Sequence, residues 1–211
     1  MRVRVENTLV YAIWATLGVA IIASLFLAQW EMGFVALATL LASLVPSIMA
    51  RRFGIRLPMP FLAGVILFIF ATLFLGEAFD FYERYRWWDI LMHGFSAIGL
   101  GLAGFIFIFV VFEGDKYAAP AWAIAFIAFC LAMTMGVFWE IFEYAMDTQF
   151  GLNMQKSGLP DTMGDLIVNA IGATIGAGAA FLYLKGREKD GLAALIADFV
   201  HKNRRLFRRL R

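Results

Sequence analysis

The sequence predicts an all-α membrane protein, a polytopic bundle of six transmembrane helices with a C-terminal amphipathic interfacial helix. Of its 211 residues, 62% are hydrophobic and only 16% are charged, whereas soluble domains are about half apolar and about a quarter charged. Its mean hydropathy is +0.78. The apolar residues also gather in runs that are too long for barrel strands, and in lipid such runs satisfy their backbone as helices.

Six apolar runs are each near or above the ~20 residues that a helix needs to cross ~30 Å of hydrocarbon. The first run lacks a small-residue cleavage site, so it is expected to be a retained helix. The single cysteine, Cys130, is expected to be a buried, unreactive thiol. Residues 1–187 are expected to form the transmembrane domain and 188–211 a basic cytoplasmic helix. The expected spans are 8–28, 33–50, 60–77, 88–112, 119–147 and 162–184.

Lys and Arg predict the orientation, because cytoplasmic loops are enriched in both. With six spans, the predicted outer side holds Arg84, Arg86 and Lys156 as its basic residues. Both termini are therefore expected in the cytoplasm, as in a multi-pass protein of a bacterial-type cytoplasmic (inner) membrane. The basic residues of the predicted inner side are Arg2, Arg4, Arg51, Arg52, Arg56, Lys116 and those that follow the sixth run.

The segment 190–211 alternates apolar and basic residues with helical spacing. This pattern predicts an amphipathic helix that lies on the anionic lipids of the inner leaflet. Nucleic acid is a less suitable partner for a helix tethered beside a membrane. The apolar face comprises Leu192, Leu195, Ile196, Phe199, Leu206 and Leu210, and the basic side comprises Lys202, Arg204, Arg205, Arg208, Arg209 and Arg211.

Acidic residues enter the outer ends of the last three runs, each set on one helix face. A charged side chain within hydrocarbon is expensive, so these groups need partners, protons or a metal. The first two runs contain no such residues in their interiors. The set consists of Asp89 and His93 in the fourth run, Glu140, Glu143 and Asp147 in the fifth, and Asp161, Asp165 and Asn169 in the sixth.

Small residues recur in the fourth and sixth runs. Small residues let membrane helices approach closely, so these two helices are expected to pack tightly and to bring His93 towards Asn169 and Asp165. The glycines are Gly94, Gly99, Gly101 and Gly104 in the fourth run and Gly172, Gly176 and Gly178 in the sixth.

Each polar residue also has a purely structural alternative. Asp161 could cap the sixth helix, and Thr162 with Asp165 fits a capping box. Asn169 could form an interhelical hydrogen bond, and Asp147 could be solvated at the interface. Glu140 and His93 could likewise be structural hydrogen-bonding groups. We favour one shared site, because the polar residues invade three helices at one membrane level.

An oxygen-rich set with one imidazole suits a divalent cation such as Mg, Mn, Ca or Zn. Such a metal could polarise a phosphate or activate water. Without a metal, His93, Glu140 and Glu143 could form a proton relay or an acid/base pair. The predicted metal ligands are Asp89, His93, Glu140, Glu143 and Asp165, the predicted orienting residues are Asn169 and Asp161, and the predicted residues of the substrate entrance are Trp88 and Trp139, together with Trp87.

Three blocks carry a resemblance to a known family. They are W-W-D-I-L-M-H-G-F, F-W-E-I-F-E-Y-A-M-D and D-T-M-G-D-L-I-V-N-A-I-G-A, within residues 60–184. This region resembles the YjdF-type family of bacterial inner-membrane proteins and, more distantly, the VanZ-like family linked to glycopeptide resistance. The resemblance implies a shared site at the polar residues above and names no reaction.

Three functions follow as hypotheses. The first is a membrane enzyme, a metal-dependent hydrolase or transferase, or a binding protein for an envelope lipid or lipid-linked molecule. The second is transport of a cation or proton, which the apolar stretch after His93 disfavours for a channel but not for a gated carrier. The third is a structural or assembly role in which the glycine faces are packing seams. A homo-oligomer is compatible with each.

Overall fold

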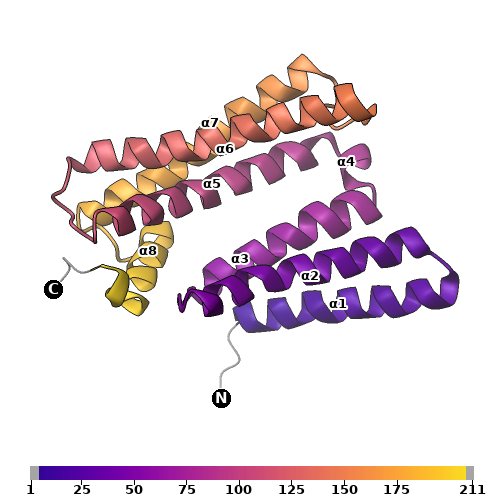
Figure 1. The fold of residues 1–211 in the computed structure, drawn as a ribbon, viewed down its shortest axis with the longest axis horizontal. Coiled ribbons are helices and arrows are strands. Elements are labelled where there is room, and N and C mark those ends of the chain that lie inside the picture. The colour runs from indigo at the N-terminus through magenta and orange to yellow at the C-terminus, as the bar shows by residue number, and fades with distance from the viewer. Residues whose placement is uncertain (1–4, 208–211) are drawn as a thin grey trace. The chain divides into compact units, whose positions relative to one another are not determined.

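The computed structural model describes residues 5–207, and this part of the chain is built from helices and the turns that join them (Figure 1). Six of its helices are long and apolar enough to cross a membrane. The predicted all-α fold with six spans is therefore confirmed. The terminal residues on which part of the orientation rested, Arg2, Arg4 and 208–211, lie outside the described residues.

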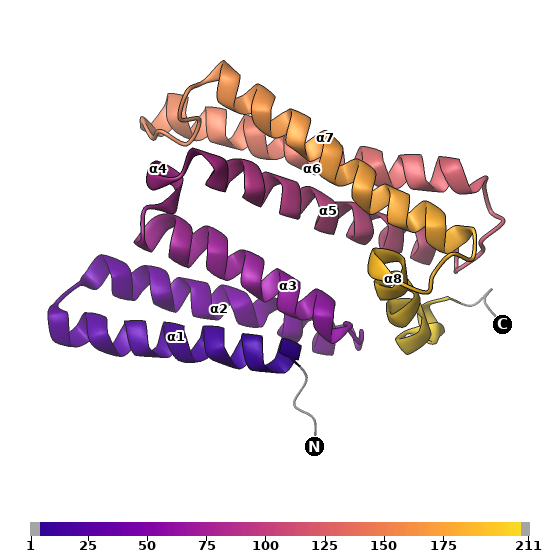
Figure 2. The same ribbon diagram turned by 180° about the vertical axis from the view of Figure 1, so that it is seen from behind.

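The chain divides into two compact units, Met1–Trp88 and Asp89–Arg211. In the first unit α1 packs against α2 and α3, and the π-helical segment η1 continues α3 and contacts α2 (Figures 1 and 2). Leu17 and Ile66 are fully buried among these helices. The helices are α1 (Val5–Leu27), α2 (Trp30–Arg52), α3 (Met59–Ile69), η1 (Phe70–Ala78) and the short α4 (Phe81–Arg84).

In the second unit the long helices α5, α6 and α7 run alongside one another, and the short helix α8 lies at one end (Figure 2). In it α7 packs against both α6 and α8. The helix α5 starts in the last residues of the first unit and runs through the second. The helices are α5 (Arg86–Val111), α6 (Ala121–Phe150), α7 (Leu159–Leu184), α8 (Gly191–Lys202) and the 3-10 turn η2 (Arg204–Leu206).

The predicted close approach of the fourth and sixth spans is confirmed as contact between α5 and α7. A Cβ atom at Gly176 would lie 2.7 Å from the carbonyl oxygen of Ile98 and 3.0 Å from the Cα atom of Gly101. A Cβ atom at Gly172 would lie 2.6 Å from the carbonyl oxygen of Gly94. The two backbones therefore touch at these glycines, as small residues allow in membrane helices.

The C-terminal segment differs from the amphipathic helix predicted over 190–211. Within the described residues, α8 ends at Lys202, where Asn203 donates a side-chain hydrogen bond of 2.7 Å to the carbonyl oxygen of Phe199. Ile196 and Phe199 are buried, and the Phe207 ring packs at a tilt against Phe109 of α5. The apolar face of α8 thus packs on the protein, because α7 offers it an apolar surface.

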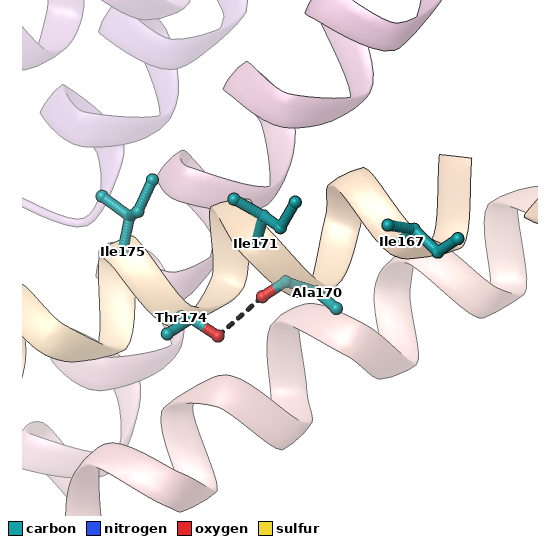
Figure 3. Close-up of a pocket in the computed structure, with 5 residues that line it drawn as sticks. All are labelled: Ile167, Ala170, Ile171, Thr174 and Ile175. Carbon is teal, nitrogen blue, oxygen red and sulfur yellow. Dashed lines mark hydrogen bonds between the residues drawn. The ribbon is translucent and has the colours of Figure 1, made fainter. Parts of the chain in front are cut away.

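The outer surface of the spans is apolar. Isoleucines project from the face of α7 opposite Asp165 and line an open groove of about 420 Å³ (Figure 3). Within it, Thr174 donates to the carbonyl oxygen of Ala170 at 2.7 Å, so its hydroxyl is satisfied by its own helix. Cys130 is exposed on α6, and the expectation of a buried thiol is wrong. The apolar outer surface of the spans is suited to contact with lipid.

Candidate metal centre

The first part of the centre lies near the start of α5. Asp89 and His93 are one turn apart, and His93 Nε2 lies 3.6 Å from the Oδ1 atom of Asp89. The imidazole is buried, whereas the Asp89 side chain is 22% exposed. A separation of 3.6 Å is longer than a good hydrogen bond, so the two groups face each other without being bonded.

Glu140 of α6 approaches the same imidazole from its other nitrogen. Its Oε1 atom lies 3.7 Å from His93 Nδ1. One turn earlier on α6, Gly136 leaves room for Asn169 of α7, because a Cβ atom there would lie 2.6 Å from Asn169 Nδ2. Gly136 is a site residue that the sequence reasoning missed, and its spacing of four residues before Glu140 was the available signal.

Asp165 and Asn169 of α7 complete the group. Both face inward and are 2% and 1% exposed. One ligand atom from each of Asp89, His93 and Asp165 lies within 4.8 Å of the others. The structure therefore brings together polar residues of α5, α6 and α7 inside the second unit, as the sequence predicted.

Several polar atoms in this group are buried and have no hydrogen-bond partner among the residues that the structure describes. They include both carboxylate oxygens of Glu140, which is 4% exposed. Asp165 Oδ2 and Asn169 Nδ2 are in the same state. A buried polar group left unpaired costs about 1–3 kcal/mol, and a charged group costs more. Among the described residues, these carboxylate oxygens thus lack a donor, and the Asn169 amide nitrogen lacks an acceptor.

Glu143 lies at the margin of this arrangement. It is buried, and its Oε1 atom accepts a hydrogen bond of 2.8 Å from Trp139 Nε1 on the same helix. Trp139 itself is 48% exposed. Asp161, at the start of α7, is half-buried. Trp88 belongs to the first unit, where its ring packs edge-on against Phe81.

The capping alternatives do not explain the acids of α7. This helix begins at Leu159, its N-cap residue is Gly158, and no side chain caps it. The Thr162 hydroxyl instead accepts a hydrogen bond of 2.6 Å from Gln155 Nε2. Asp165 lies in the second turn and is buried, beyond the backbone N–H groups that a capping residue would satisfy.

Asp147 holds the loop between α6 and α7 and is not simply solvated. Its two carboxylate oxygens accept hydrogen bonds from the backbone N–H groups of Met154 and Gln155, at 2.7 and 2.9 Å. The alternative of an acid that is merely solvated at the interface therefore does not describe Asp147, because its carboxylate satisfies two adjacent amides of the loop.

We expect Asp147→Ala to loosen this loop. Losing two hydrogen bonds to a charged acceptor should cost about 3 kcal/mol or more locally, and hydrogen exchange at Met154 and Gln155 should accelerate. Asp147→Asn keeps one acceptor oxygen and should show a smaller effect. Unchanged exchange in both variants would contradict this role for Asp147.

Helices of this length and hydropathy, with ionisable groups gathered inside one unit, define an integral membrane protein with several spans. The chain belongs to the predicted membrane protein family DUF2238, whose model matches residues 7–186.

The chain is also similar to an uncharacterized protein of Thermotoga maritima, with 27% identity over 104 residues. That match covers 49% of this chain and 53% of the relative, so the chain spans about half the length of the curated relative that it matches. No solved structure matches the chain.

Proposed function

We propose that this membrane protein binds a divalent metal ion between α5, α6 and α7. Asp89, His93, Glu140 and Asp165 would hold it. The observation that carries the proposal is the Glu140 carboxylate, which is buried beside His93 while neither of its oxygens has a hydrogen-bond donor within residues 5–207. A bound cation offsets the cost of such a carboxylate.

The donor set favours a metal over a proton alone. Three carboxylates and an imidazole from three helices converge here, and the ligand atoms of Asp89, His93 and Asp165 are already close together. Carboxylate oxygens suit Mg²⁺ and Mn²⁺, and the imidazole extends the choice to Zn²⁺. Asn169 would orient these ligands from the next turn of α7.

Beyond metal binding, we propose that the site binds or acts on an envelope lipid or a lipid-linked molecule. A bound metal would supply a Lewis acid that polarises a phosphate or activates water, in a hydrolase or transferase. Glu143 would hold or transfer a proton at its Oε2 atom, while Trp139 fixes its Oε1 atom. The exposed Trp139 ring would contact the substrate at the entrance.

The packing along α5 does not favour transport. Beyond the cluster, α5 and α7 are in backbone contact at Gly101 and Gly176. Further along, Phe105 and Phe109 are fully buried and pack against Tyr183. No buried ionisable group among the described residues of α5 continues a path from His93.

We also propose a membrane and an orientation for this protein. The distribution of Lys and Arg supports a bacterial-type inner membrane, with both termini in the cytoplasm and the metal centre near the outer leaflet. The three sequence blocks support a YjdF-like assignment within the family and a more distant VanZ-like relationship.

Metal analysis tests the proposal directly. We expect purified full-length protein, supplied with Mn²⁺ or Zn²⁺ and then desalted, to retain about one metal ion per chain. His93→Ala and Asp165→Asn should each lower the retained metal at least tenfold, because each removes one of a small set of ligands. The measurement is elemental mass spectrometry of the desalted protein.

The matched control is Glu188→Gln, which removes a carboxylate near the end of α7, where Lys116 is its partner at 4.0 Å. This variant should retain metal as the wild type does. Wild-type protein that retains no metal, or equal retention in all four proteins, would overturn the proposal.

A further inference from the structure

A second polar feature lies at the opposite end of α7 from the metal centre. The helix ends at Leu184, which is also the end of the sixth candidate span. Gly186 adopts a φ of 73°, and Arg187 N–H donates to the carbonyl oxygen of Leu182 at 2.9 Å. This backbone cap turns the chain sharply, so that Lys185 and Arg187 both follow directly on the span.

These two cations share a shallow cavity with apolar residues of the last helical turn. The cavity has a volume of about 360 Å³ and is lined by Phe181, Leu182, Lys185 and Arg187. The ammonium group of Lys185 lies 5.7 Å from the centroid of the Phe181 ring. Leu182 is exposed beside it. The site therefore combines two positive charges with apolar surface at the end of a membrane span.

Neither cation has a carboxylate partner among residues 5–207. Other basic residues of this unit do: Lys116 lies 4.0 Å from Glu188, and Lys202 lies 2.6 Å from Asp198. Lys185 and Arg187 are both exposed. Their charges are therefore available to a ligand that reaches the membrane surface.

We propose that this cavity binds an anionic phospholipid. Lys185 and Arg187 bind the phosphate and the anionic headgroup, and Phe181 and Leu182 contact the start of an acyl chain. The end of a hydrophobic span is at the depth of the headgroups, and basic pockets there recognise anionic lipids. The guanidinium of Arg187 adds the bidentate geometry that phosphate accepts.

This lipid site differs from the one predicted over 190–211. There the apolar face of an amphipathic helix was expected to enter the leaflet, whereas Ile196 and Phe199 are buried against the protein. At the end of α7, by contrast, Leu182 stays exposed next to the two cations. The combination of apolar and positive groups that a lipid requires is therefore found in the cavity.

The test measures lipid retention by full-length protein in detergent, with native mass spectrometry after addition of phosphatidylglycerol or phosphatidylcholine. The wild type should bind phosphatidylglycerol more tightly. Lys185→Gln with Arg187→Gln should weaken that binding roughly thirtyfold, at ~1 kcal/mol for each cation near the membrane surface. Phosphatidylcholine binding should change little.

The matched control is Lys189→Gln with Arg204→Gln, which removes two exposed charges outside the cavity. It should stay within about twofold of the wild type, because charges outside the cavity act only at longer range. An equal loss in both double variants would show unspecific surface charge and would overturn the site. Three other results would also overturn the site. They are equal affinity for the two lipids, unchanged phosphatidylglycerol affinity in the cavity variant, and displacement of the lipid by excess inorganic phosphate. If the double variant does not fold, the single variant Lys185→Gln replaces it. We expect this substitution to weaken phosphatidylglycerol binding roughly fivefold.

Discussion

Glu140→Gln should shift the thermal stability of the protein in opposite directions with and without metal. In chelator, the variant should be more stable by about 1–3 kcal/mol, because the substitution removes a buried carboxylate for which the described part of the chain supplies no donor. With metal in hundredfold excess over its Kd, the wild type should gain about 2.7 kcal/mol. The variant should gain much less. The order of the two melting temperatures therefore inverts on addition of metal.

Glu188→Gln serves as the control, because its carboxylate lies beyond the end of α7 that is opposite the centre, 4.0 Å from Lys116. Any effect of this substitution should be the same with and without metal. If Glu140→Gln lowers the melting temperature equally in chelator and in metal, Glu140 is a structural hydrogen-bonding residue and the proposed ligand role is wrong.

Gly172→Leu should destabilise the second unit and abolish metal retention together. A Cβ atom at this position would lie 2.6 Å from the carbonyl oxygen of Gly94 and 2.8 Å from the Cβ atom of Ala97. Backbone atoms cannot move aside without separating α5 from α7. Overpacking of this kind costs about 1–3 kcal/mol, and the separation would carry His93 away from Asp165. Thermal unfolding and elemental analysis of the same sample would measure both effects.

Gly178→Leu provides a matched control on the same helix. Its Cβ atom would meet nothing within 4 Å, and leucine is a better helix former than glycine by up to ~1 kcal/mol. This variant should therefore be as stable as the wild type or slightly more stable, and it should retain metal. Similar losses in both variants would mean that the contact between α5 and α7 does not hold the centre together.

Much of this architecture could be predicted without coordinates. The six spans follow from the length and hydropathy of the apolar runs, because lipid leaves few alternatives for the backbone. The face on which each polar residue lies follows from helical spacing, which places Glu140 and Glu143 on one face of α6 and Asp165 and Asn169 on one face of α7. The contact between α5 and α7 follows from small residues at matching positions.

Which acidic side chains have hydrogen-bond donors depends on the neighbours that each one meets in the folded protein. Glu143 and Glu140 are one turn apart, yet Trp139 donates to Glu143 Oε1 while no described residue donates to Glu140. Asp147 resembles a surface acid in sequence and binds two loop amides in the structure. The presence or absence of a hydrogen-bond donor depends on the geometry between elements, which spacing along one helix does not contain.

Composition and helical spacing are enough to show that a membrane-spanning helical protein carries acids and one histidine in its last three spans. Which of these side chains meet depends on how the helices pack. Helical periodicity sets the face on which a residue lies, but the axial register of α5 against α7 is set by backbone contact at Gly101, Gly172 and Gly176. That register brings a ligand atom of Asp165 on α7 within 4.8 Å of those of Asp89 and His93 on α5.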